Sequence, residues 1–271
     1  MDSLYTNNEM LALADLLRGE AMGRMIDSLG IPTGGVGLDA GCGIGSLTPM
    51  LVNAASRGGY VVGIDYDIDA LRCARTGPVR NNLSHIKGTL TRLPFPDSVF
   101  DWALSVDCAG MMPGSAHDMI AELVRILKPG GMLALAAWTS QMLLPGHPIL
   151  EAHLSATPQG VAPFTDGLSP SLHFLRLRER LEAAGLNEVR VRSFLGEIHP
   201  PRDENEERAL ASLFFMRWGD DLHEFPEAER LLYRSLIDPA SDDCIFHRSD
   251  YYAWFTYTLF TGRPGRGREP R

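Results

Sequence analysis

Three glycines at alternate positions, Gly41, Gly43 and Gly45, follow a short apolar segment that contains Asp39. Glycine adopts backbone angles that are closed to other residues, and it lets a ligand approach bare main chain. The spacing G-x-G-x-G differs from the G-x-G-x-x-G of pyrophosphate-binding folds and from the G-x-x-x-x-G-K-[ST] phosphate loop. A carboxylate just before the loop would repel a diphosphate but would attract a cationic or amine-bearing ligand. We therefore expect the loop to bind a ligand that carries positive charge.

Residues 39–45, Asp-Ala-Gly-Cys-Gly-Ile-Gly, resemble motif I of the class I S-adenosylmethionine-dependent methyltransferases. The segment 61–65 ends in an acid 20 residues after Gly45, as such a family requires for the ribose hydroxyls. Residues 93–101 are similar to the signature before the family's fourth strand, and 127–131 to its turn into the fifth strand. Each element alone could be a structural turn or a helix cap, but the four in this order are far more specific.

The resemblance covers residues 33–138 and continues loosely to about residue 262. It implies S-adenosylmethionine as cofactor, S-adenosylhomocysteine as product and a small molecule as methyl acceptor. The implied cofactor-binding residues lie in the glycine loop and at the ends of the following strands: Asp39, Gly41, Cys42, Gly43, Gly45, Asp65, Tyr66, Thr89, Leu90, Ser105 and Val106.

The resemblance also implies which part of the cofactor these residues would contact. Gly41 and Asp39 would hold the methionine amino end, directly or through water, and Asp65 would accept from both ribose hydroxyls. Tyr66 would lie against the adenine face. Main chain at Ser105 and Val106 would lie beside the sulfonium.

Thr89 and Leu90 would flank the adenine edge, where many relatives carry Asp-Ala. A threonine hydroxyl can accept from the adenine amino group, but with less charge assistance than a carboxylate. This departure puts the cofactor affinity in doubt rather than the identity of the cofactor.

Methyl transfer from a sulfonium is an in-line displacement, so alignment and desolvation of the reactants can supply much of the rate. An acceptor that must lose a proton needs a base in addition. The candidates are His147, His117 and Asp107, although a solvated or helix-capping role is the simpler interpretation of each histidine. The sequence leaves open whether any base is used and which atom is methylated.

The order of elements indicates an α/β fold with a doubly wound, mostly parallel sheet and a late antiparallel strand. The strand candidates are 36–39, 60–65, 85–87, 101–106, 132–138, 188–198 and the second half of 251–260. The helix candidates are 47–56, 68–75, 117–127, 147–156, 172–184, 204–218 and 226–237, together with 9–29, where Gly19 and Gly23 favour a bend between two short helices.

We expect five regions along the chain. They are an N-terminal helical cap at 1–32, the cofactor-binding core at 33–138, an insertion or lid at 139–168, the rest of the core with a helical cap (204–237) at 169–262, and a basic tail at 263–271. Aromatic residues of the cap, with Tyr251, Tyr252 and Trp254, could line a cavity for an apolar acceptor or could pack on one another. Both interpretations stay open.

The chain has 271 residues, 45 % of them hydrophobic, and a formal net charge of −9, which argues against a nucleic-acid or anionic-membrane footprint. The cysteines form no C-x-x-C pair, and 65–69 lacks the glycine and terminal acid of a calcium loop, so we expect no metal. No cationic start with an apolar run is present, which predicts a cytoplasmic protein outside the membrane. The oligomeric state stays open.

Three other functions compete with methyl transfer. A relative of the same fold could transfer a different alkyl group from the sulfonium, and a non-catalytic module could bind the cofactor without turnover. A nicotinamide oxidoreductase is disfavoured because it requires the G-x-G-x-x-G spacing.

Overall fold

The computed structural model describes residues 7–111, 115–161, 169–201, 203–219, 222–223 and 225–265. The chain divides into two compact units. The helical unit holds the described residues of Met1–Glu20, Ser140–Asp166 and Leu195–Thr256, and the sheet unit holds those of Ala21–Thr139, Gly167–Phe194 and Tyr257–Arg271.

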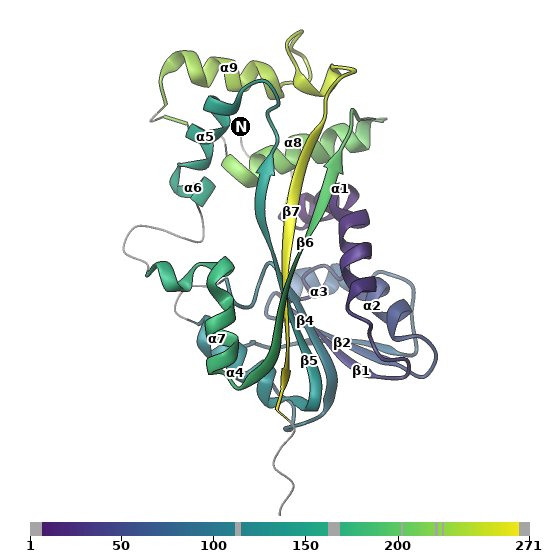
Figure 1. Cartoon of the computed structure of the whole chain (residues 1–271). Helices are drawn as coiled ribbons and strands as arrows, with labels where there is room; N and C mark the ends of the chain where they lie inside the picture. Colours follow the sequence, from purple (N-terminus) through teal and green to yellow (C-terminus); the bar gives the residue numbers. More distant parts are fainter. Residues whose placement is uncertain are drawn as a thin grey trace, which may run out of the picture. The chain divides into compact units, whose positions relative to one another are not determined.

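In the described residues seven strands form one sheet in the order β3-β2-β1-β4-β5-β7-β6 (Figure 1). They are β1 (Val36–Ala40), β2 (Tyr60–Asp65), β3 (Leu83–Lys87), β4 (Phe100–Val106), β5 (Leu127–Met142), β6 (Leu186–Ile198) and β7 (Ala253–Pro264). Strands β1 to β5 pair in parallel, whereas β7 runs antiparallel between β5 and β6. The predicted α/β class and the late antiparallel strand are confirmed.

The α-helices of the described residues are α1 (Asn7–Ser28), α2 (Thr48–Ala55), α3 (Ile68–Ala74), α4 (Ala116–Arg125), α5 (Pro148–Ser155), α6 (Pro158–Val161), α7 (Leu177–Ala183), α8 (Glu204–Trp218) and α9 (Glu227–Ile237). Local chemistry sets several of their starts. Asp67 caps α3 by accepting from the backbone N–H groups of Asp69 and Ala70, and Asp203 caps α8 in the same way. Pro148 opens α5, where its missing N–H costs nothing.

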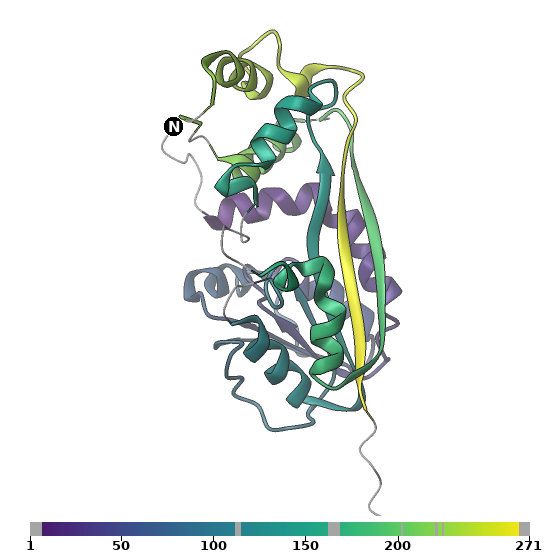
Figure 2. The same cartoon turned by 60° about the vertical axis from the view of Figure 1, so that its left-hand side comes forward.

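Side chains of both sheet faces are buried in the sheet unit. On β5, Leu133, Leu135 and Ala137 join a core cluster with Ile120 of α4 and Leu181 of α7. Because side chains alternate along a strand, the residues between them point to the opposite face. There α2 packs on β1 and β2, and α3 packs on β3 (Figure 2).

A close approach of two strands fixes the middle of the sheet. Gly37 on β1 pairs with Trp102 on β4, and the fully buried indole lies directly over the glycine. A Cβ added to Gly37 would come within 1.9 Å of the Trp102 ring. Glycine is therefore required here for packing rather than for backbone freedom.

Several predicted boundaries differ from those of the structure. Helix α1 runs without a break through Gly19 and Gly23, since its buried face continues through Met22 and Met25. The predicted helix 172–184 begins instead with two 3₁₀ turns, η1 (Pro170–Leu172) and η2 (Phe174–Arg176).

Strand β5 extends to Met142, into the segment expected as an insertion. Arg263, expected in the tail, lies in β7 and donates from Nη1 to the Gly130 carbonyl at 2.7 Å. The tail residues 266–271 lie outside the described residues.

Buried aromatic rings pack on one another in the helical unit. Phe214 contacts Trp218 and Phe246 with ring centroids 5.4 Å apart in each pair, and Tyr233 and Tyr251 extend the cluster. These rings are at most 2 % exposed. These rings therefore pack on one another, as in the second of the two interpretations given above.

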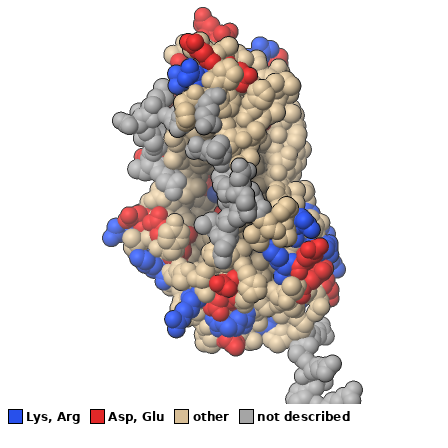
Figure 3. Space-filling model, turned by 90° about the vertical axis from the view of Figure 1, so that its left-hand side faces the viewer, with Lys and Arg blue, Asp and Glu red and all other residues tan. Residues whose placement is uncertain are grey.

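No helix in the described ranges is long and apolar enough to cross a membrane. On the face drawn in Figure 3, acidic and basic side chains lie interspersed rather than in separate fields of one sign. Charges mixed in this way give that face a weak net potential.

Glycine-to-alanine changes at two positions test the account of the packing. Gly37→Ala should destabilise the protein by about 1–3 kcal/mol, because the new methyl group must displace the Trp102 ring. Gly19→Ala should stabilise it by up to about 1 kcal/mol, because α1 is continuous there and a Cβ meets nothing within 4 Å. Urea unfolding followed by circular dichroism measures both, and a destabilising Gly19→Ala would show that the helix is broken at that point.

Candidate functional site

The glycine loop leaves the carboxyl end of β1 and enters α2. Gly41, Gly43 and Gly45 all have positive φ angles, of 80°, 52° and 79°. Backbone N–H groups of Gly41 and Cys42 donate to the Ile64 carbonyl of β2 at 2.8 and 3.0 Å, and Gly45 N–H donates to the Cys42 carbonyl. The loop is thus fixed by main-chain bonds in a conformation that side chains disfavour.

The three glycines serve different purposes. A side chain at Gly41 would come within 2.6 Å of Cys108 Sγ, and one at Gly45 within 2.9 Å of Ala74 Cβ. At Gly43 a Cβ would meet nothing within 4 Å, so one side of the loop is open. An open main-chain surface between two tightly packed glycines suits a ligand that lies against the backbone.

Asp65, the last residue of β2, is 9 % exposed and lies beside this loop. Its Oδ2 accepts from Gly43 N–H at 2.8 Å and its Oδ1 accepts from Asp67 N–H at 2.9 Å. A carboxylate has about four lone-pair sites, so two remain for further donors. The side chain that is predicted to hold the ribose is therefore already oriented by the protein.

Asp39 is buried at the end of β1, with 4 % exposure, and accepts from Thr48 Oγ1 at 2.6 Å. Burial raises the pKa of Asp39 from its ordinary value to about 6, the Thr48 hydrogen bond opposes this rise, and the charge of Asp65 adds to it. Ionising Asp39 therefore costs the folded protein free energy as the pH rises through about 6. A cation bound near the loop would offset that cost.

Two thiols lie against the same loop and remain protonated at neutral pH. Burial raises the pKa of Cys42 well above its ordinary range, and it raises the pKa of Cys108 to about 11. Nucleophilic cysteines need a lowered pKa. Cys42 and Cys108 thus act as packing groups around Gly63 and Gly41.

The end of β4 is tied to the end of β1. Ser105, fully buried, donates from Oγ to the Ala40 carbonyl at 2.7 Å and accepts from Ala109 N–H at 3.0 Å. The half-buried Val106 follows at the end of the strand. The strand ends that carry Asp39, Asp65 and Ser105 are therefore adjacent in the sheet.

The residues predicted to contact the adenine follow the carboxyl ends of β2 and β3 in the chain. Tyr66 directly follows Asp65 and is 78 % exposed, so its ring is available to a ligand. Thr89 is exposed and shares a 2.9 Å hydroxyl hydrogen bond with Thr91. Leu90 is 5 % exposed and packs into the core cluster, which leaves its main chain for any contact at this edge.

The segment 93–97 is held by ionic hydrogen bonds from α4. Arg125 donates to the Leu93 and Phe95 carbonyls and pairs with Asp97 and Glu122 at 2.7 Å each. Glu122 Oε2 also accepts from Leu93 N–H at 2.7 Å. Hydrogen bonds to Arg125 hold the pKa of Glu122 below its ordinary value. The Leu-Pro-Phe-Pro-Asp motif is thus a fixed segment that ends near the start of β4.

The three base candidates differ in their surroundings. Asp107 follows β4 directly with φ +52°, and it accepts from Tyr257 OH at 2.7 Å and from Trp138 N–H at 2.9 Å. His117 lies in the first turn of α4 with its side chain 93 % exposed. His147 precedes α5 in the helical unit, where its side chain makes no cap hydrogen bond. Of the three candidates, Asp107 is the one whose carboxylate is oriented by two hydrogen-bond donors among the described residues.

Sequence reasoning missed Thr48, Cys108 and Tyr257 as parts of this region. Thr48 reaches Asp39 only because the loop turns back on itself, and Tyr257 reaches Asp107 across 150 residues of sequence. The position of Thr48 at the start of the helix after the loop could have indicated its role. Nothing in the sequence indicated the contacts of Cys108 and Tyr257. In the described residues no group of three or more His, Cys, Asp or Glu side chains could hold a metal ion.

Comparison with known proteins matches residues 38–135 to the family described as "Methyltransferase domain". The 24-methylenesterol C-methyltransferase 2 of Oryza sativa subsp. japonica is 33 % identical over 124 residues, which are 44 % of this chain and 33 % of that protein. The sterol 24-C-methyltransferase of Eremothecium gossypii is 34 % identical over 113 residues, 40 % of this chain and 30 % of that one. The match therefore spans about a third of the length of these relatives.

A solved chain from the complex between the Haloferax volcanii Trm112 methyltransferase activator and a methyltransferase is similar in fold. It has a TM-score of 0.58 and 20 % identity, and the alignment covers 97 % of this chain and 94 % of that one. Identity this low supports the shared fold alone. Residues 38–135 are thus similar in sequence to a methyltransferase domain, and the described chain shares its fold with a solved methyltransferase complex.

Proposed function

We propose that the protein binds S-adenosylmethionine in the glycine loop and transfers its methyl group to a small-molecule acceptor. The observation that carries the proposal is the oriented carboxylate of Asp65 beside the open side of Gly43. The methyltransferase family match to residues 38–135, which include both, supports it. Once bound, the cofactor supplies an electrophilic methyl group on a sulfonium.

The remaining roles follow from the position of each residue. Asp65 would accept from the ribose hydroxyls, and Asp39 would face the positive end of the cofactor. Tyr66 would cover the adenine ring, with the main chain of Thr89 and Leu90 at its edge. Main chain of Ser105 and Val106, with the loop residues Gly41, Cys42 and Gly45, would complete the binding surface.

The acceptor is proposed to be a small organic molecule, and curated relatives that act on sterols support this class. Their match covers less than half of this chain, and the family match ends at residue 135, before most of the helical unit begins. We propose that residues outside the matched domain contribute to the choice of acceptor. The cytoplasmic location stays a prediction.

A structural neighbour described as a [4+2]-cyclase, SpnF, has a TM-score of 0.52 and 20 % identity over 90 % of this chain and 82 % of that one. The fold alone thus does not decide the reaction.

The reaction is tested by incubating the protein with S-adenosylmethionine and a library of small acceptors and analysing the products by mass spectrometry. We expect S-adenosylhomocysteine and a product heavier by one CH₂ group. Consumption of an acceptor with no change in its mass and no S-adenosylhomocysteine would refute methyl transfer.

Asp65 variants test the cofactor site. Asp65→Asn should weaken S-adenosylhomocysteine binding by about 10- to 100-fold, because charged hydrogen bonds to the ribose are lost. The wild type should also lose affinity for the 2′-deoxyribose analogue, whereas Asp65→Asn should discriminate little between the two ligands. Isothermal titration calorimetry measures these affinities.

Asp69→Asn is the matched control, since Asp69 is an exposed acid in the same segment that pairs with Arg72. It should bind both ligands as the wild type does. Equal discrimination by wild type and Asp65→Asn would contradict the ribose role.

The pKa of Asp39 predicts how cofactor binding depends on pH. Because the ionised carboxylate attracts the cationic cofactor and its pKa is about 6, affinity should rise with pH and be about tenfold weaker at pH 5 than at pH 7. Thr48→Val removes the hydrogen bond that lowers this pKa, so the midpoint should move to higher pH. Calorimetric titration across this range measures both effects, and an unchanged slope in Asp39→Asn would assign the titration to another group.

Asp107 is the base that we propose for an acceptor that must lose a proton. Asp107→Asn should lower kcat by about 100-fold or more while leaving the dissociation constant of S-adenosylhomocysteine unchanged. His117→Gln, at the exposed start of α4, should leave kcat within about twofold. Steady-state kinetics with the identified acceptor give these values, and the reverse pattern would move the assignment to His117.

A further inference from the structure

A cavity in the sheet unit lies apart from the glycine loop. It has a volume of about 250 Å³ and lies between the end of α1, the start of β5 and the strands β6 and β7. Its lining includes Met132, which pairs with Trp102 near the start of β4, whereas Ala136 of β5 pairs with Val106 at the opposite end. Four residues of strand separate these positions by about 13 Å. The cavity is therefore at the end of the sheet away from the loop.

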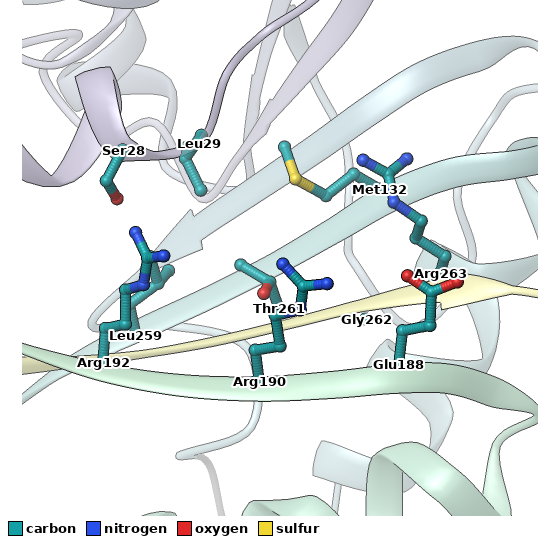
Figure 4. A pocket seen from close by; sticks show the side chains of 10 residues that line it. All are labelled: Ser28, Leu29, Met132, Glu188, Arg190, Arg192, Leu259, Thr261, Gly262 and Arg263. Atoms are coloured by element: carbon teal, nitrogen blue, oxygen red, sulfur yellow. The ribbon is translucent and has the colours of Figure 1, made fainter.

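Three arginines line this cavity. Arg190 and Arg192 rise from one face of β6, and Arg263 rises from the neighbouring β7 (Figure 4). No ion pair within the described residues joins Arg190 or Arg192 to an acidic side chain, and Arg263 donates to a carbonyl, that of Gly130. Guanidinium groups gathered on one wall repel each other unless an anion lies between them.

The charge of the lining favours a dianion. Glu188 is the acidic member of the lining, so three guanidinium groups and one carboxylate leave a formal charge of +2. A phosphate monoester carries close to two negative charges at neutral pH, and the forked guanidinium matches its oxygens. A monocarboxylate would leave the cavity cationic.

The other walls suit an organic group attached to the phosphate. Leu29, Met132 and Leu259 provide apolar surface, and the Thr261 hydroxyl provides a polar contact. Glu188 has a left-handed backbone, with φ +55°, at the edge of the cavity. Such backbone strain is concentrated at binding sites, because the surrounding structure must maintain it.

We propose that this arginine cavity binds a phosphate monoester, at a site distinct from the cofactor loop. The phosphate would lie against Arg190, Arg192 and Arg263, and its organic group against Leu29, Met132 and Leu259. The site is formed entirely by the sheet unit and needs no bound cofactor.

Calorimetry in phosphate-free buffer tests the site with phenyl phosphate, inorganic phosphate and benzoate. Phenyl phosphate should bind at least about tenfold more tightly than benzoate, because of its second charge, and more tightly than inorganic phosphate, because of its ring. Equal binding of phenyl phosphate and benzoate would overturn the proposal.

Variants of the cavity separate a built site from general attraction of anions. Arg190→Gln with Arg192→Gln should weaken phenyl phosphate by about 10- to 100-fold. Arg176→Gln, an exposed arginine that does not line the cavity, should change nothing. Glu188→Gln should tighten binding by about threefold, a gain that misfolding cannot produce. An equal loss in Arg176→Gln, or no loss in the double variant, would refute the site.

Vesicles distinguish a free phosphate ester from a lipid headgroup. Flotation with phosphatidylcholine vesicles, with and without phosphatidic acid, would show binding to the acidic vesicles if the phosphate belongs to a lipid, and the double variant should abolish it. Binding of phenyl phosphate without flotation would assign a soluble ester. S-adenosylhomocysteine affinity should stay unchanged in all these variants, so the outcome is independent of the cofactor site.

Discussion

One carboxylate, that of Asp65, organises the candidate site. It accepts from Gly43 N–H in the loop after β1 and from Asp67 N–H at the start of α3, so two neighbouring βα turns are fixed to one buried acid. The Gly41 and Cys42 N–H groups on the Ile64 carbonyl complete the link. The Asp65 side chain is therefore held in one orientation before a ligand binds. This lowers the entropic cost of binding a ligand that hydrogen-bonds to it.

The electrostatics of the two proposed sites are opposite in sign and lie at opposite ends of the sheet. At the carboxyl ends of β1 and β2, Asp39 and Asp65 offer negative charge in a buried setting, which suits a sulfonium. At the other end the arginine cavity offers positive charge in a chain whose formal net charge is −9. Because the two proposed sites differ in charge, a cationic ligand would favour one end of the sheet and an anionic ligand the other.

Local spacing predicted much of the sheet unit, and the contacts that it could not predict are long-range. The loop, the acid at Asp65 and the parallel strands depend on neighbouring residues, so the sequence was sufficient for them. The continuity of α1 through Gly19 depends on burial of its far end, which overrides the low helix propensity of glycine. Contacts such as Tyr257 with Asp107 join distant segments and left no sequence pattern.

A crystal structure with S-adenosylhomocysteine tests the central claim most directly. We predict that both ribose hydroxyls lie within hydrogen-bonding distance of the Asp65 carboxylate and that the homocysteine main chain lies along Gly41–Gly43. The adenine should then contact Tyr66. A ligand bound elsewhere, or an Asp65 carboxylate that contacts only the Gly43 and Asp67 amides in the complex, would contradict the account.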